Sequence, residues 1–152
     1  MSGKPPRASK KARITSARLA AVQALYQHAL SGAPLAEVKL SFLDHYAGAK
    51  LDGDQFVMPD EAHWLAVLDG VESYEWQTDQ AIEQGIHAAQ PGRKTENMEL
   101  LLRLILRCGA FELMHNTAEK PIIINDYVNI AKSFYDQKEP AFVNAVLDKI
   151  GP

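Results

Sequence analysis

The sequence predicts an all-α protein, a compact helical bundle of two small helical subdomains with about six to seven helices. Apolar residues recur at spacings of three and four along most of its 152 residues, the period of a helix packed on one face. The short apolar run 122–124 has no second strand-like segment with which to pair, so we expect it to be a buried segment that leads into a helix rather than a strand. A chain of this length can bury a hydrophobic core that is stable without cross-links. Its one cysteine, Cys108, excludes a framework of disulfide bonds.

Two helices are predicted in the first third of the chain. From Ser16 an apolar stripe continues to residue 30, and Gly32 ends it. A second stripe follows Pro34 and runs to Tyr46. Residues 48–59 contain two glycines and a proline, which predict a loop.

Asp60 is a good N-cap for a third helix, which carries apolar residues through Val71. Residues 77–89 form a further, more polar helix. It either continues the third helix or follows a break near Ser73; the pattern leaves both open. The segment 90–93, Gln-Pro-Gly-Arg, marks the clearest internal boundary of the chain.

Three helices are predicted in the last third. Thr95 caps a strongly apolar helix over about 96–115, in which Gly109 indicates a close helix crossing. Asn125 caps the next helix, and Pro140 suits the first turn of the last one. Together the signals divide the chain into a basic flexible arm (1–18), an N-terminal helical subdomain (19–90) and a C-terminal helical subdomain (91–152).

The charge is unevenly distributed. Residues 1–18 carry six bases and no acid, whereas the rest of the chain carries ten bases and nineteen acids. A cationic arm on an acidic body is typical of proteins that bind nucleic acid, because such an arm releases the counterions condensed on phosphates. A solubilising terminus, or an affinity for any polyanion, explains the same charge.

Catalytic and cofactor motifs are not found. The five histidines are scattered, with none at metal-ligand spacing, and Cys108 lies in the most apolar segment, where an inert thiol is the default. We therefore expect no enzyme activity, no cofactor and no metal. No apolar run reaches the roughly 18 residues of a membrane helix, and the N-terminus lacks a signal core, so we expect a cytoplasmic protein without a membrane partner.

Separate blocks of residues together resemble the NusB family of transcription antitermination factors. The likeness covers about 16–30 and 100–150, and order, spacing and identity agree across its blocks. They are Ala21–Tyr26, Leu106–Leu113, Ile124–Val128, Ile130–Phe134 and Phe142–Asp148. The resemblance implies two small helical subdomains, binding to single-stranded boxA RNA of ribosomal RNA leaders, and a heterodimer with the ribosomal protein NusE. It also implies action on RNA polymerase elongation complexes through other Nus factors.

The resemblance and the charge together give candidate RNA-binding residues. We expect four bases near the first helix to neutralise phosphates: Lys10, Lys11, Arg13 and Arg18. Gln23 is a candidate for reading a base edge. Tyr26 either stacks on a base or packs in the core. Arg103 and Arg107 share one helix face and either extend the basic surface or form a solvated rim.

For the protein partner, family position indicates Phe142 and Asn144 on the last helices, although Phe142 also fits the core. Two other interpretations of the chain stay open. One is an accessory helical domain related to that of ribosomal RNA cytosine methyltransferases. The other is a pure protein-interaction module whose basic arm is incidental.

Overall fold

The computed structural model describes residues 8–49 and 57–152 of the chain, and over these residues it contains helices and no strands. The helices, seven within the described ranges, are α1 (Lys10–Ser31), α2 (Leu35–Ala49), α3 (Glu61–Ser73), α4 (Glu75–Ala89), α5 (Leu100–Met114), α6 (Lys120–Phe134) and α7 (Lys138–Asp148). The all-α prediction and the predicted number of helices are therefore confirmed.

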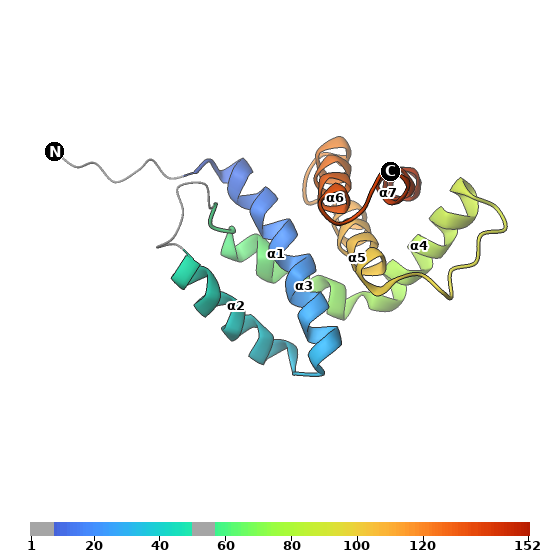
Figure 1. Cartoon of the computed structure of the whole chain (residues 1–152). Helices are drawn as coiled ribbons and strands as arrows, with labels where there is room; N and C mark the ends of the chain where they lie inside the picture. The colour runs from blue at the N-terminus through green and yellow to red at the C-terminus, as the bar shows by residue number, and fades with distance from the viewer. Residues whose placement is uncertain (1–7, 50–56) are drawn as a thin grey trace.

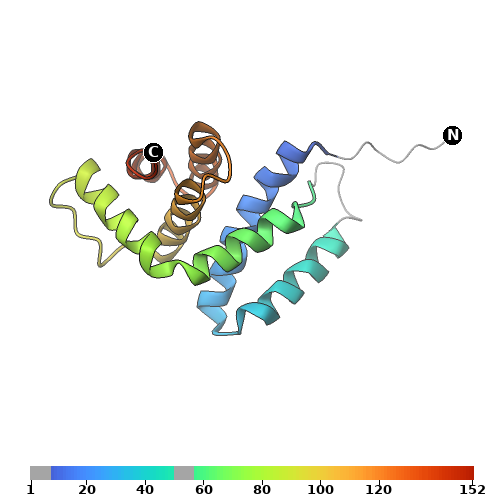
Figure 2. The ribbon, with the colours of Figure 1, turned by 180° about the vertical axis from the view of Figure 1, so that it is seen from behind.

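The helices form two groups that share one core. Helix α1 packs on α2 and α3, while α5, α6 and α7 pack against one another (Figure 1). Helix α4 contacts α5 and α7 but neither α1 nor α2, although it follows α3 almost directly (Figure 2). The structure thus groups residues 75–89 with the C-terminal helices. The predicted division at residue 91 lies too late, because the chain changes group at the break between α3 and α4, at Tyr74.

The basic segment is partly helical. Helix α1 begins at Lys10, where the Ser9 hydroxyl accepts a hydrogen bond from the Ala12 backbone N–H at 3.1 Å. A side chain that accepts such a bond stabilises the first turn of a helix. The predicted flexible arm over 1–18 is consequently wrong for residues 10–18, and residues 1–7 lie outside the described part of the chain. At the other end of α1, Gly32 takes the left-handed conformation (φ 72°) that stops the helix.

Other helix ends test the sequence signals. Asp60 is the N-cap of α3, as predicted, and its carboxylate accepts from the His63 backbone N–H at 2.8 Å. The predicted caps Thr95 and Asn125 are wrong. Helix α5 starts only after Glu99, and α6 starts at Lys120 with a proline in its first turn. Since the first helical N–H groups need no partner, this proline is tolerated, and the apolar run 122–124 becomes helical.

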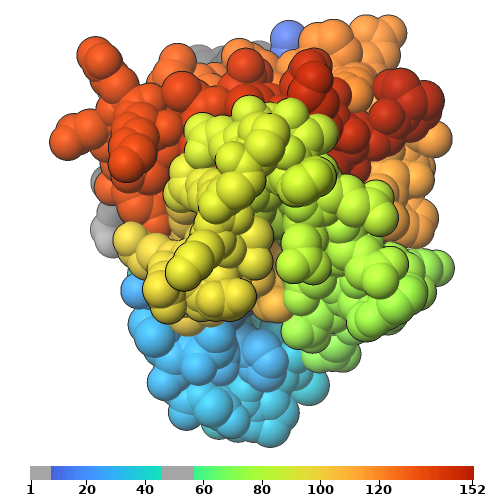
Figure 3. All heavy atoms as spheres, turned by 90° about the vertical axis from the view of Figure 1, so that its right-hand side faces the viewer, coloured from blue at the N-terminus to red at the C-terminus, as the bar shows by residue number. Residues whose placement is uncertain are grey.

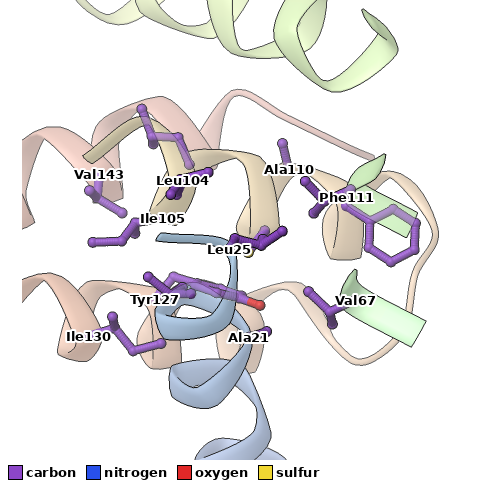
Figure 4. Close-up of a cluster of buried hydrophobic side chains, with 14 of the residues drawn as sticks. Ala21, Leu25, Val67, Leu104, Ile105, Ala110, Phe111, Tyr127, Ile130 and Val143 are labelled. Atoms are coloured by element: carbon purple, nitrogen blue, oxygen red, sulfur yellow. The ribbon is translucent and has the colours of Figure 1, made fainter. Parts of the chain in front are cut away.

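The buried hydrophobic side chains form one core cluster with members from all seven helices of the described ranges. Figure 4 shows part of it, with Ala21 of α1, Val67 of α3, Ile105 of α5 and Tyr127 of α6 facing one another. Gly109 stands at a tight crossing, as predicted, because a Cβ there would lie 2.8 Å from Cδ1 of Leu147 on α7. These contacts fix α1 against α5 and α6, and so place its basic end beside α6.

Candidate nucleic-acid interface

The first turn of α1 presents two exposed cations. Lys10 and Lys11 are exposed and form no ion pair with a described residue, and the first turn of the helix contains no acid. The N-terminal end of a helix also carries a partial positive charge. The start of α1 is therefore a local surface that attracts anions.

Arg13 is held by its own chain. Its Nε donates to the Ala8 carbonyl at 3.2 Å, and its Nη1 lies 3.7 Å from Asp60 Oδ2. The Arg13 carbonyl in turn accepts from the Asp60 backbone N–H at 2.9 Å. Arg13 thus ties the start of α1 to the start of α3, and its side chain is only 17% exposed.

Arg18 does not lie on the surface. Its side chain is 2% exposed, and its guanidinium contacts two acids from distant parts of the chain. Nε and Nη2 donate to the Glu112 carboxylate at 2.9–3.1 Å, and Nη1 donates to Asp126 Oδ2 at 2.8 Å. The expected phosphate contact of Arg18 is incompatible with this burial. Arg18 instead joins α1 to α5 and α6.

Glu112 is the centre of this buried cluster. Besides Arg18, its carboxylate accepts hydrogen bonds from Thr117 (2.7 Å) and from the Tyr127 hydroxyl, and His63 Nε2 lies 2.7 Å from Oε1. Burial opposes the charged form, but the hydrogen bonds from His63 and Arg18 outweigh it and lower the pKa of Glu112 to about 2. The cluster thus contains an ionised carboxylate, fully paired, where four helices meet.

A cleft of about 750 Å³ opens between α1 and α6. Lys11 stands at its α1 side together with Thr15 and Gln23, and α6 contributes Asp126 and Asn129. Thr15 Oγ1 donates to Asp126 Oδ2 at 2.9 Å and so links the two walls. Volumes of about 300–1,000 Å³ are those of pockets that bind small molecules. A cleft with hydrogen-bonding walls therefore adjoins the cationic end of α1.

Two of the predicted residues on α1 have different surroundings. Gln23 is exposed and lines the cleft, which fits the predicted contact with a base. Tyr26 is partly buried and packs against the core. Of its two predicted roles, the structure shows the packing one.

The two arginines of α5 lie away from this cleft. Arg107 forms a bidentate pair with Asp79 of α4, at 2.7 and 2.8 Å, and lies 3.4 Å from Glu75. Arg103 Nη2 donates to the Thr95 carbonyl at 2.8 Å, which holds the loop before α5. Neither residue lines the cleft, so the structure does not bring them together with Lys10 and Lys11.

The two residues predicted to meet a protein partner also differ. Phe142 is buried (2% exposed), and the Arg93 guanidinium lies over its ring at 3.7 Å. Figure 3 shows the loop over 90–99 beside α7 on this face of the molecule. Phe142 is consequently not available for a direct contact. Asn144 is exposed and lines two adjoining cavities between α6 and α7, of about 530 and 430 Å³.

No metal site or membrane segment is found in the part of the chain that is described. Its His, Cys, Asp and Glu side chains form no group of three or more that could hold a metal ion. None of its helices is both long and apolar enough to cross a membrane. Cys108 is buried in α5, and burial raises the pKa of its thiol.

Comparison with known proteins decides the family. The NusB family is matched over residues 15–152, nearly the whole chain. The chain belongs to the NusB family. It is 37% identical over 137 residues to the transcription antitermination protein NusB of Bradyrhizobium diazoefficiens, covering 90% of this chain and 81% of that protein. It is 38% identical over 135 residues to that of Caulobacter vibrioides, covering 88% and 89%. The chain is thus an antitermination protein of a non-enzymatic family.

Solved structures have the same fold. NusB of T. maritima superposes with a TM-score of 0.67 at 21% identity, covering 99% of this chain and 96% of that one. A chain from "Crystal Structure of a Plectonemic RNA Supercoil" gives a TM-score of 0.70 at 22% identity, covering 92% and 93%. These likenesses show that the seven helices of the described ranges have the arrangement of the NusB fold.

Sequence reasoning missed the α6 wall of the cleft. Asn129 and Ser133 lie one turn apart on α6 and both face α1. The spacing of four between Asn129 and Ser133 indicates that they share one helix face, but nothing in the sequence indicates which helix that face contacts. The burial of Arg18 had a signal: it stands three and four positions before the apolar Ala21 and Val22, on the buried stripe.

Proposed function

We propose that this NusB-family protein binds single-stranded RNA of the boxA type, from ribosomal RNA leaders, through the first turns of α1. In this proposal it acts without catalysis, forms a heterodimer with the ribosomal protein NusE, and joins RNA polymerase elongation complexes through other Nus factors. Membership of the antitermination family supports the general role. The RNA and its binding surface are argued from the residues of α1.

The main support for the proposal is the difference between basic side chains that are paired with acids of the chain and those that form no ion pair with a described residue. Arg18, Arg107 and Arg13 are engaged by acids of the chain itself, whereas Lys10 and Lys11 stand exposed without an ion pair to a described residue. Cations without internal partners are the ones that can neutralise phosphates and release counterions. They lie at the helix end that carries a partial positive charge, next to the cleft.

The groove between α6 and α7 supports a separate surface for NusE. Asn144 and Val128 line both of its cavities, and Pro140 and Ala141 add apolar surface at one end. A largely apolar groove whose two cavities share a polar residue, Asn144, suits a protein contact. This groove and the cleft lie on different sides of α6, so RNA and NusE can bind together.

A fluorescence anisotropy titration tests the RNA proposal. Labelled boxA RNA and a scrambled RNA of equal length are titrated with the protein at two salt concentrations, with and without NusE. We expect boxA RNA to bind at least about tenfold more tightly than the scrambled RNA when NusE is present, and binding to weaken with salt. Equally poor binding of both RNAs under all conditions would reject the proposal and favour a pure protein-interaction module.

The partner surface needs its own experiment. Asn144→Arg places a long charged side chain in the α6–α7 groove and should weaken NusE binding by about tenfold or more, measured by calorimetry. Gln84→Arg, on the exposed side of α4, is the control and should bind NusE normally. If both variants bind NusE equally well, the groove is not the docking surface.

A further inference from the structure

We infer that the cleft between α1 and α6 receives one base of the bound RNA and selects a base whose pairing edge carries an amino group next to an unprotonated ring nitrogen, which is adenine or cytosine. The inference rests on the proposed RNA binding and assigns base recognition to residues of α6. It goes beyond phosphate contacts, which position an RNA without reading its sequence.

The apolar parts of the cleft suit the faces of a base. Leu19 of α1, Ile130 of α6 and Val57 line it, and the first of these is partly buried while Ile130 is 6% exposed. A base that leaves the stack of a single strand needs such apolar surface, and unpaired bases are the usual targets of sequence-specific RNA recognition. The volume of about 750 Å³ accommodates a nucleoside.

The polar groups of the α6 wall have unused hydrogen-bonding capacity. Asn129 is exposed, and its side-chain amide has no hydrogen-bond partner among the residues that are described. An amide offers a donor and an acceptor side by side, which pairs with an amino group and an adjacent ring nitrogen. Ser133 donates its own proton to the Asn129 carbonyl at 3.2 Å and keeps its oxygen as an acceptor.

Asp126 supplies the preference for an amino group. Its Oδ2 is occupied by Arg18 and Thr15, but no residue of the described ranges donates to Oδ1, and the side chain is 10% exposed where it lines the cleft. An ionised carboxylate accepts hydrogen bonds and donates none. It therefore favours the amino group of adenine or cytosine over O4 of uracil, which would be left facing an acceptor.

The neighbouring charges make this arrangement compatible with RNA. Asp126 lies 2.8 Å from the buried Arg18, and this guanidinium, which it shares with Glu112, offsets part of its charge before RNA arrives. Lys11 stands at the opposite wall of the same cleft, where it can meet the phosphate next to an inserted base. The cleft thus combines a cation for the backbone with acceptors for a base.

Separate titrations of three homopolymers test the inference. Fluorescein-labelled oligo(A), oligo(C) and oligo(U) of about twelve nucleotides are titrated with the full chain at low salt. We expect oligo(A) and oligo(C) to bind about fivefold or more tightly than oligo(U), the discrimination of one good base contact. Binding of all three with equal affinity would overturn the inference and leave the proposed RNA binding intact. No binding of any of the three would also overturn the inference, whereas the proposed function is tested separately by the titration with boxA RNA and NusE.

Substitutions then locate the selectivity. Asn129→Ala removes one of the two contacts to the base and should reduce the preference by about twofold or more, and Ala12→Leu, which fills the cleft from α1 without changing charge, should bring the three affinities within about twofold of each other. Asn125→Ala is the matched control, because Asn125 is exposed on α6 but lines the groove toward α7. Preference retained in Asn129→Ala and Ala12→Leu, with native circular dichroism, would overturn the inference.

Discussion

Arg18 and Glu112 form a buried bidentate ion pair across 94 positions of the sequence, with three donor–acceptor distances of 2.9–3.1 Å. The pair joins the first helix to the central helix α5. A third group, Asp126 of α6, shares the guanidinium at 2.8 Å. Orientation of α1 against α6, and with it the shape of the cleft, depends on this cluster.

Removing one partner of the pair should destabilise the protein strongly. Glu112→Gln leaves the buried Arg18 with Asp126 as its one charged partner among the described residues and removes the bidentate pair, and we expect a loss of about 3–5 kcal/mol in the free energy of unfolding, measured with urea. Asp79→Asn is the control, since it breaks the partly exposed pair with Arg107 and should cost about 1 kcal/mol or less. Similar losses in the two variants would contradict the central role of the buried pair.

The same carboxylate predicts a pH dependence. The pKa of Glu112 is about 2 in the folded protein against an ordinary value of 4.5, so the unfolded chain takes up the proton first as the pH falls. Its stabilising contribution, on the order of 3 kcal/mol, is complete above about pH 4.5 and is lost between about pH 4.5 and 2. Carboxyl chemical shifts should show Glu112 still ionised at about pH 3.5. A titration midpoint near its ordinary value would show that the cluster does not hold the charge.

The crossing of α3 and α5 tolerates no side chain at Gly70. A Cβ there would lie 2.1–2.6 Å from three atoms of the Phe111 ring, so Gly70→Ala should destabilise the protein by about 1–3 kcal/mol despite the better helix propensity of alanine. Thermal unfolding measures this loss. Phe111→Leu in the same chain removes the ring and should recover part of it; a double variant as unstable as the sum of the singles would disprove the clash.

The exposed lysines should act on RNA binding alone. Replacing Lys10 and Lys11 by alanine should lower RNA affinity and reduce the slope of log affinity against log salt by about 1.4, roughly 0.7 for each phosphate that is no longer neutralised. Lys94→Ala with Lys149→Ala removes the same charge from exposed positions outside the cleft. Titrations at several salt concentrations separate the two pairs. An equal reduction of the slope in both would mean that only net charge matters.

The helices were predictable because their signals are local. The apolar stripes of α1 and α5, the N-cap Asp60 and the stop at Gly32 all act within a few residues. The predicted starts of α5 and α6 were wrong because Thr95 and Asn125 are good capping residues that tertiary packing leaves unused. Local propensity is a weak guide where a helix end is fixed by distant contacts.

The candidate site was predictable only in part. The excess of bases at the N-terminus marks Lys10 and Lys11, but charge does not reveal which bases have internal partners. Arg18 and Arg107 find theirs 94 and 28 positions away, and no sequence spacing encodes such pairs. The cleft depends in the same way on α6 standing beside α1, so its α6 wall has no signature in the sequence.

Mapping the RNA on the protein tests the central claim most directly. Backbone amide shifts of the labelled protein are recorded as boxA RNA is added. The largest changes should fall on residues 9–23, which are the N-cap and the first part of α1, and on residues 126–133 of α6; these segments form the two walls of the cleft. Changes confined to α2 and α4, with the start of α1 and α6 unaffected, would contradict this account.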